Sequence, residues 1–502
     1  MEDWTRMRLS ADEARPTSRL AQPWLLLLLL ILLTAYRLWI IPRLGVTLYI
    51  DEAQYWTWAK DLDWGYFSKP PVIGWLIAAS TAVFGDGLLA VKLPSLILYP
   101  ATAWLMYLIG ARLFDARVGF RVGLACALMP FVSALGLAVS TDAPLMFFWA
   151  LAMFALIRAL EADRMRDWLL LGTAVGLGIM SKYTMAAFGL SAALYLLSNV
   201  RLRRIFVHPG LWAAIALTCL IVLPNVIWNW AHDFPTLRHT AEITHVEGLN
   251  DKNGNIGAFI VAQIGSLGPG FALAFLGGLL LAWRKRHDGR YQFLLAFSIP
   301  LLAIVLIQAE RSEANGNWAA PALLAALLLG TKFLARLKQQ RWWTVALGIN
   351  IMLMLGVYHL GDYYQLTGQT QTAKLDPLKR AKGWDQLGTA VRPFVRANPE
   401  AIMLTEDRTM MAHMLYQLRD LDPDHAAWAP HAHPADHYQL TVPLTDALHG
   451  RPFLLISQDD RPALIERFAN AKKLTRISLE IEPGLKREAS VYLLQGFRGY
   501  SR

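Results

Sequence analysis

The chemically densest stretch of the chain is residues 49–71, which begin Tyr-Ile-Asp-Glu-Ala-Gln-Tyr-Trp-Thr-Trp and end Lys-Pro-Pro. Two adjacent carboxylates, Asp51 and Glu52, lie shortly after the first apolar run, and Lys69 follows them. A carboxylate in this position can deprotonate an acceptor hydroxyl or amine, or hold a cation. Lys69 precedes two prolines that exclude helix, and a lysine fixed in this way suits a phosphate oxygen. We therefore predict that this loop is half of an active site. The alternatives are a solvated helix cap for the acidic pair and ordinary headgroup contact for Lys69.

The same stretch is rich in aromatic rings. Rings of this kind either stack on sugar faces or anchor a loop among lipid headgroups, and both interpretations stay open. We predict Tyr55 and Tyr66 as substrate contacts. The dense set within the loop is Tyr55, Trp56, Trp58, Trp64, Tyr66 and Phe67.

Three further positions have the residue types that a transfer reaction needs. Asp142 lies in Ser-Thr-Asp-Ala-Pro between two apolar runs, where it is either a helix N-cap or a second carboxylate that frames the acceptor. Lys182 lies in a tight turn, Ser-Lys-Tyr, and we predict it as a ligand of the donor phosphate. Asn317, just before another apolar run, is predicted to contact substrate.

Two arginines are also candidate phosphate ligands. Arg238 lies in the longest polar loop between apolar runs, and Arg311 lies between Glu310 and Glu313, with which it can pair instead. Three histidines near Arg238 raise the question of zinc, but their spacing of seven and six residues fits no common ligand motif. No metal ligand is therefore predicted, and a divalent cation is left open as a cofactor. The histidines are His232, His239 and His245.

These candidates have to be positioned by helices that cross a membrane. Apolar residues make up 55% of the chain and charged residues 17%, and the mean hydropathy is +0.33. Repeated apolar runs of roughly 18–22 residues predict a polytopic α-helical membrane protein with about eleven spans. A shorter run at 72–84 is predicted to be interfacial or re-entrant. The predicted spans are 23–42, 87–110, 118–138, 143–160, 168–181, 184–199, 211–229, 257–283, 291–308, 318–335 and 342–360.

The distribution of lysine and arginine predicts the orientation. If the N-terminus is cytoplasmic, twenty-one basic residues fall on the cytoplasmic side and eight on the other, which is a strong positive-inside bias. The net charge of +10 therefore reflects cytoplasmic loops, and no nucleic-acid partner is expected. The eight outer residues are Arg43, Lys60, Lys69, Lys92, Lys182, Arg238, Lys252 and Arg311.

The chain changes character near residue 361. We predict a transmembrane catalytic domain over 1–360, with its first outer loop at 43–86, and a periplasmic α/β domain over 361–502. Within the second domain, strands are predicted at 400–405, 452–457 and 489–496, and helices at 383–397 and 408–419.

The Asp-Glu-Ala-Gln-Tyr-Trp segment leading to Lys-Pro-Pro, followed by Lys92-Leu-Pro-Ser, resembles the dolichyl-phosphate-mannose-protein mannosyltransferase family. This family belongs to the glycosyltransferase C superfamily, and its bacterial members include polyprenyl-phosphate-sugar transferases that modify lipid A and its core. The likeness extends in outline over 40–360. Relatives often have arginine before Leu-Pro-Ser, whereas this chain has Lys92. A bidentate contact of the kind that arginine makes is therefore not expected at this position.

The resemblance implies a division of roles. Asp51 would be the catalytic base, with Glu52 beside it and Asp142 assisting placement, while Lys69 and Arg238 or Arg311 would hold the lipid phosphate. The substrates implied are a polyprenyl-phosphate-sugar donor and a lipid, glycan or protein acceptor, handled at the outer face of the inner membrane among membrane lipids. No nucleotide site is needed, and the sequence contains no P-loop or dinucleotide fingerprint. The alternative is a transporter or flippase of polyprenyl-linked intermediates, which favours paired repeats that the sequence does not clearly contain.

Overall fold

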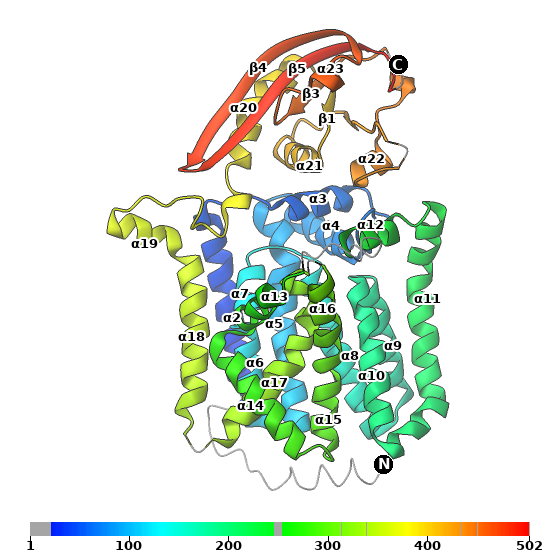
Figure 1. Cartoon of the computed structure of the whole chain (residues 1–502), viewed down its shortest axis with the longest axis vertical. Helices are drawn as coiled ribbons and strands as arrows, with labels where there is room; N and C mark the ends of the chain where they lie inside the picture. Colours follow the sequence, from blue (N-terminus) through cyan, green and yellow to red (C-terminus); the bar gives the residue numbers. More distant parts are fainter. Residues whose placement is uncertain are drawn as a thin grey trace. The chain divides into compact units, whose positions relative to one another are not determined.

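A computed structural model describes residues 22–244, 254–312, 314–337, 339–431, 433–448 and 450–500 (Figure 1). The chain divides into two compact units, each assembled from segments that are distant in sequence. The helical unit comprises Met1–Trp39, Lys69–Leu76 and Lys92–Val357. The α/β unit comprises Ile40–Ser68, Ile77–Val91 and Tyr358–Arg502.

The helical unit consists of apolar helices joined by short turns. Among the described residues, seven helices are long and apolar enough to cross a membrane, or eight if one bent pair forms a single span. The chain is therefore a multi-pass membrane protein. Its helices are α2 (Pro23–Ile40), α5 (Leu88–Leu113), α6 (Ala116–Ala127), α7 (Pro130–Leu135), α8 (Asp142–Ala162), α9 (Met165–Ile179), α10 (Ala187–Ser198), α11 (Pro209–Ala231), α12 (Pro235–Thr244), α13 (Ile256–Leu267), α14 (Pro269–Arg284), α15 (Gly289–Ala296), α16 (Ile299–Arg311), α17 (Ala320–Arg336) and α18 (Arg341–Tyr358), with 3₁₀ turns η3 (Tyr183–Ala186), η4 (Val200–Val207) and η5 (Gly316–Ala319).

The predicted number of eleven spans is not confirmed. Several of the apolar runs fold as helices that are too short to be counted as membrane spans. The run at 118–138 is interrupted before Pro130 and gives α6 and α7, of 12 and 6 residues. α9 has 15 residues and α10 has 12. The bent pair is α13 and α14, whose axes differ by 102° at Gly268, where φ is +86° and Pro269 starts the next helix. Hydropathy records apolar length but not these breaks.

Small residues allow the helices to pack closely. α9 packs between α8 and α11, and α14 packs on α17 (Figure 1). At Gly172 of α9 an added Cβ would lie 2.5 Å from the carbonyl oxygen of Ala214 in α11. Without water to drive association, such contacts supply much of the packing between membrane helices. A buried guanidinium also makes a polar contact between two helices: Nη2 of Arg37 in α2 donates to the carbonyl of Ala127 in α6 at 3.0 Å.

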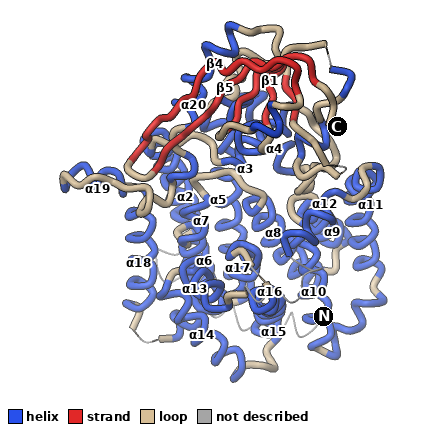
Figure 2. The backbone as a smooth tube through the Cα atoms, turned by 45° about the horizontal axis from the view of Figure 1, so that its top comes forward, coloured by secondary structure: helices blue, strands red, loops and turns tan. Residues whose placement is uncertain are grey.

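The α/β unit is built on a five-stranded sheet with the order β2-β1-β3-β5-β4 (Figure 2). β1 pairs in parallel with β2 and β3, whereas β5 pairs antiparallel with β3 and β4. The strands are β1 (Ile402–Thr405), β2 (His425–Ala427), β3 (Phe453–Ser457), β4 (Phe468–Glu482) and β5 (Leu485–Phe497). The helices of the unit are α3 (Ile50–Lys60), α19 (Leu360–Thr367), α20 (Trp384–Ala397), α21 (Arg408–Gln417), α22 (His437–Thr441) and α23 (Pro462–Ile465), and α4 (Val72–Phe84) has residues in both units.

The three predicted strands and two predicted helices of this segment are confirmed within a few residues, as β1, β3, β5, α20 and α21. β2 has only three residues and β4 is mostly exposed, so neither carries an apolar run that would have revealed it. α21 packs against α3. The first loop and the C-terminal segment therefore share one compact unit, although 334 residues separate Thr47 from its hydrogen-bond partner Ala381.

Candidate active site

The two adjacent carboxylates of the first loop take different positions. α3 starts at Ile50, and the Tyr49 N–H donates to Glu52 Oε2 at 2.7 Å, so Glu52 caps the helix and is buried. Asp51 is one residue earlier, and 43% of its side chain is exposed. The helix N-terminus favours its negative charge. Asp51 is therefore the accessible carboxylate of the pair. The cap that we considered for the pair is made by Glu52, whose catalytic role stays a prediction.

Asp51 has a partner that the sequence interpretation missed. Nη2 of Arg408 donates to Asp51 Oδ1 at 3.2 Å, and Nη1 donates to Gln54 Oε1 at 2.9 Å. Asp51 and Gln54 lie one turn apart on α3, so one guanidinium spans both. Arg408 is the first residue of α21, and Asp407 caps that helix. A signal was present in the sequence: a basic residue in the first turn opposes the helix dipole, so it needs a separate reason to be there.

The dense set of aromatic residues in the loop is buried, except for Trp64, which is exposed. The rings of Tyr66 and Trp58 stack with centroids 4.4 Å apart, and the Tyr66 hydroxyl donates to the Trp58 carbonyl at 2.9 Å. His437 lies edge-on to both rings, and burial lowers the pKa of His437 to about 4. Tyr55 is also buried, with its ring 4.9 Å from that of Trp58. These rings stiffen the loop that carries Asp51. The predicted substrate contacts of Tyr55 and Tyr66 stay predictions.

The helical unit brings three other predicted residues together. Lys182 Nζ and Asn317 Nδ2 each donate to Asp142, to Oδ1 and Oδ2 respectively, and both distances are 2.7 Å. Asp142 is 2% exposed. It is the first residue of α8, and the N-cap is Thr141, so the alternative that Asp142 is the N-cap is not what the structure shows. Its two carboxylate oxygens are occupied by residues from two later turns.

A second set of polar contacts holds this cluster in place. The Tyr183 hydroxyl donates to Asn225 Oδ1 at 2.6 Å, and Asn229 Nδ2 donates to that hydroxyl at 3.2 Å. Gln263 Nε2 donates to the Gly316 carbonyl at 2.8 Å, beside Asn317. Asn225 and Asn229 were not predicted from the sequence. Two amides at i and i+4 inside an apolar run are costly in a membrane and were the available signal.

The other predicted phosphate ligands are placed separately. Lys69 is half-buried before α4, while Arg238 on α12 and Arg311 at the end of α16 are exposed. Glu313, the second alternative partner of Arg311, lies outside the described residues. Phosphate binding by all three stays a prediction. Asp51 belongs to the α/β unit and Asp142 to the helical unit, so their shared role around one acceptor also stays a prediction.

Metal binding has no support from clustered side chains. In the part of the chain that the structure describes, no group of three or more His, Cys, Asp and Glu residues is arranged to hold a metal ion. His245, one of the three histidines considered above, is not among those residues.

Part of this chain matches a known protein family. Residues 68–228 match the family model described as dolichyl-phosphate-mannose-protein mannosyltransferase. The predicted family resemblance is confirmed. Lipid A galacturonosyltransferase RgtD of Rhizobium johnstonii is 28% identical to this chain over 438 residues, which cover 85% of this chain and 90% of RgtD.

Two other relatives match over a shorter range. The lipopolysaccharide core galacturonosyltransferase RgtA of the same organism is 28% identical and is covered over 60% of its length. An undecaprenyl phosphate-alpha-4-amino-4-deoxy-L-arabinose arabinosyl transferase of Pseudomonas paraeruginosa is 29% identical and is covered over 54%. Each match includes 58% of this chain. Because it covers only 60% of RgtA and 54% of the arabinosyl transferase, the chain spans less than two thirds of either relative. The relatives are named as sugar transferases, and the predicted enzyme class, a glycosyltransferase, is confirmed.

The solved structures give the fold. ArnT from Cupriavidus metallidurans in the apo state has a TM-score of 0.62 at 17% identity, over 92% of this chain and 97% of ArnT. Its complex with undecaprenyl phosphate has a TM-score of 0.61 over the same shares. The chain therefore has the ArnT fold, and the predicted glycosyltransferase C fold class is confirmed.

Proposed function

We propose that this protein moves a sugar from a polyprenyl-phosphate carrier to a lipid acceptor of the lipid A or lipopolysaccharide type. The observation that carries the proposal is the accessible carboxylate of Asp51, held by Arg408 while its neighbour Glu52 is used as a helix cap. The nearly full-length likeness to a lipid A galacturonosyltransferase supports the acceptor class. The arabinosyl transferase likeness supports a polyprenyl-phosphate donor. A protein acceptor is less favoured, since none of the three relatives described above is named for one, whereas RgtA is named for the lipopolysaccharide core.

The chemistry follows from the charges. Asp51 would take the proton of the acceptor hydroxyl as that oxygen attacks the anomeric carbon from the face opposite the phosphate. A single in-line displacement of this kind inverts the anomeric configuration. The leaving phosphate needs cations, and we assign that role to Lys69, Lys182 and one of Arg238 and Arg311. Each carboxylate oxygen of Asp142 already accepts a hydrogen bond, from Lys182 or Asn317, so we assign Asp142 to positioning rather than to proton transfer.

We further propose the orientation that the charge distribution predicts. The N-terminus would be cytoplasmic, and residues 361–502 would be periplasmic, with the protein in the inner membrane. The distribution of lysine and arginine between the two sets of loops supports this topology.

A reconstituted transfer assay tests the function. Purified protein in liposomes receives lipid A and a radiolabelled undecaprenyl-phosphate sugar, either galacturonic acid or aminoarabinose. We expect label on lipid A in the vesicles that contain protein and none in empty vesicles. Labelled carrier that crosses the bilayer without forming product would instead support the flippase alternative and contradict this proposal.

Arg408 supplies a second prediction. Because the guanidinium orients Asp51, we expect Arg408→Gln to lower kcat about tenfold with little change in KM, which corresponds to a typical charged hydrogen bond of about 1.5 kcal/mol. Arg408→Lys keeps the charge and should recover part of the rate. Arg451→Gln breaks a comparable exposed pair with Asp424, at 2.8 Å, and is the matched control. Equal kinetics for Arg408→Gln and the control would remove Arg408 from the site.

A further inference from the structure

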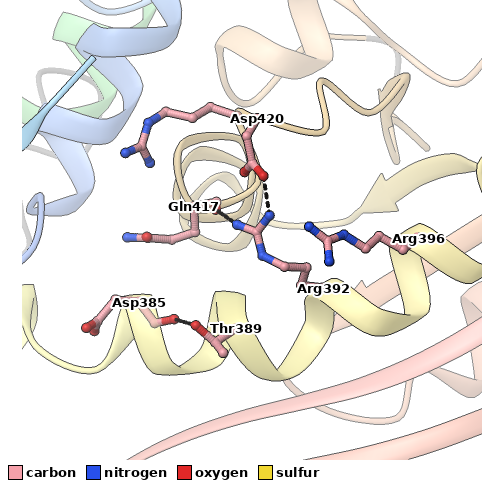
Figure 3. A pocket seen from close by; sticks show the side chains of 7 residues that line it. Asp385, Thr389, Arg392, Arg396, Gln417 and Asp420 are labelled. Atoms are coloured by element: carbon pink, nitrogen blue, oxygen red, sulfur yellow. Dashed lines mark hydrogen bonds and ion pairs between the residues drawn. The ribbon is translucent and has the colours of Figure 1, made fainter. Parts of the chain in front are cut away.

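A hollow of about 460 Å³ lies in the α/β unit between α20 and the end of α21 (Figure 3). Ligand pockets are usually lined mainly by apolar side chains. Every residue that lines this one is polar or charged, which points to a charged ligand. The lining residues are Asp385, Thr389, Arg392, Arg396, Gln417, Arg419 and Asp420.

The amphipathic pattern of α20 explains why these side chains gather there. One face of the helix buries apolar residues, among them Trp384, Leu387 and Val391, and α20 packs on β4 and β5. An adjoining face presents four of the lining residues, at positions 385, 389, 392 and 396. Steps of four, three and four residues keep them on one side of the helix. The polar lining is thus a fixed feature of the helix, and the sheet holds it in place.

The positive charge in the hollow exceeds what its carboxylates neutralise. Arg392 pairs with Asp420, and its Nη2 donates to the Gln417 carbonyl at 2.8 Å. Figure 3 shows the guanidinium of Arg396 pointing toward that of Arg392. Among the described residues Arg396 has no hydrogen-bond or ion-pair partner of its own. The hydrogen bond from Arg392, together with the charges of Arg392 and Arg396, lowers the pKa of Asp420. Two guanidinium groups therefore share one carboxylate.

Arg419 adds a third cation to the lining, and its charge also acts on Asp86. Its Nη1 donates to the Tyr416 carbonyl at 2.6 Å, and its guanidinium lies over the Tyr416 ring, 4.3 Å from the centroid. These contacts fix the direction of the side chain before any ligand arrives. Arginine groups fixed in this way are suited to phosphate oxygens. At the other wall, Thr389 donates to the Asp385 carbonyl at 2.8 Å, which leaves the threonine oxygen and the Asp385 carboxylate able to accept from hydroxyl groups.

We propose that this hollow binds a phosphorylated sugar, the phosphate at the three arginines and the sugar hydroxyls at Asp385 and Thr389. Its source would be the headgroup of the lipid acceptor, so this identification of the ligand rests on the proposed function. The hollow is then an acceptor subsite, in the same unit as Asp51 but made from other residues. Its volume is within the range of roughly 300–1,000 Å³ that small-molecule sites occupy.

The first test measures binding without catalysis. Glucosamine 1-phosphate, inorganic phosphate and glucosamine are each titrated into the purified full chain and followed by isothermal calorimetry. We expect glucosamine 1-phosphate to bind most tightly, inorganic phosphate more weakly and glucosamine not at all. Arg396→Gln should weaken the first at least tenfold, whereas the control Arg451→Gln should not. Arg396 is exposed, so an unchanged melting temperature will show that the variant is folded. Identical affinities for wild type and Arg396→Gln would overturn the proposal.

The second test uses the transfer reaction. With lipid A that carries its phosphates, Arg396→Gln should raise the acceptor KM about tenfold and leave kcat unchanged. With dephosphorylated lipid A, wild type and variant should have the same raised KM. If wild type transfers sugar but its KM does not depend on acceptor phosphate, the subsite is wrong while the proposed function stands. If wild type transfers nothing, the function fails, and the calorimetry still decides whether the hollow binds a phosphorylated sugar.

Discussion

Asp51→Asn is expected to lower kcat for sugar transfer by roughly 10²–10⁴-fold, the usual contribution of a general base. Asparagine keeps the size of the side chain and an oxygen that can still accept from Arg408, but it cannot take a proton from the acceptor. The Asp51 side chain is partly exposed at the start of α3, so the fold should tolerate the change. The measurement is single-turnover transfer to lipid A at saturating donor, with the melting temperature as a check on folding.

Glu52→Gln separates the two carboxylates. The glutamine oxygen can still accept from the Tyr49 N–H, so the cap of α3 should survive. If Asp51 is the base, Glu52→Gln should retain transfer while Asp51→Asn loses it. The reverse pattern would assign proton transfer to Glu52 and would require the buried carboxylate to become accessible.

Lys182→Met is expected to destabilise the protein by about 3–5 kcal/mol, because it leaves the buried carboxylate of Asp142 without its cation. It should also abolish transfer if Lys182 contacts the donor phosphate. Adding Asp142→Asn removes the orphaned charge, so the double variant should recover most of the stability but none of the activity. Apparent melting temperature in detergent and transfer rate, measured on the same preparations, separate the two effects.

The control for this pair is Lys60→Met. Lys60 pairs with Asp86 at 2.6 Å, but 46% of its side chain is exposed, and a solvated pair contributes about 1 kcal/mol or less. A Lys182→Met variant that melts like Lys60→Met would show that the Asp142 carboxylate is stabilised without Lys182.

Composition and motif spacing were enough for the fold class, the family resemblance and the three residues of the cluster around Asp142. The apolar run lengths demand membrane helices, and Asp142, Lys182 and Asn317 were each singled out, although their direct contact was not foreseen. The separation of Asp51 from Glu52 could not be read from the sequence, because it depends on α3 starting at Ile50. A start one residue earlier would make Asp51, rather than Glu52, the carboxylate that reaches back to the helix end.

Other features could not be predicted from local sequence patterns. Arg408 meets Asp51 only because the sheet positions α21 against α3, and no periodicity encodes such a long-range pairing. The hollow proposed as a phosphate subsite combines one face of α20 with the last residue of α21 and the residues that follow it, which the sequence places more than twenty positions apart. The break at Gly268 needs a left-handed backbone, which apolar composition around it conceals.

The packing of α3 against α21 also determines the order in which the protein can be assembled in the cell. Asp51 leaves the ribosome 357 residues before Arg408. At about 5–20 residues per second, that interval is roughly 20–70 s. During this time the helices between them insert into the membrane, while the buried face of α3, with Glu52, Gln54 and Trp58, still lacks its partner. The loop that carries the proposed base is thus among the first segments synthesised and among the last to reach its final structure.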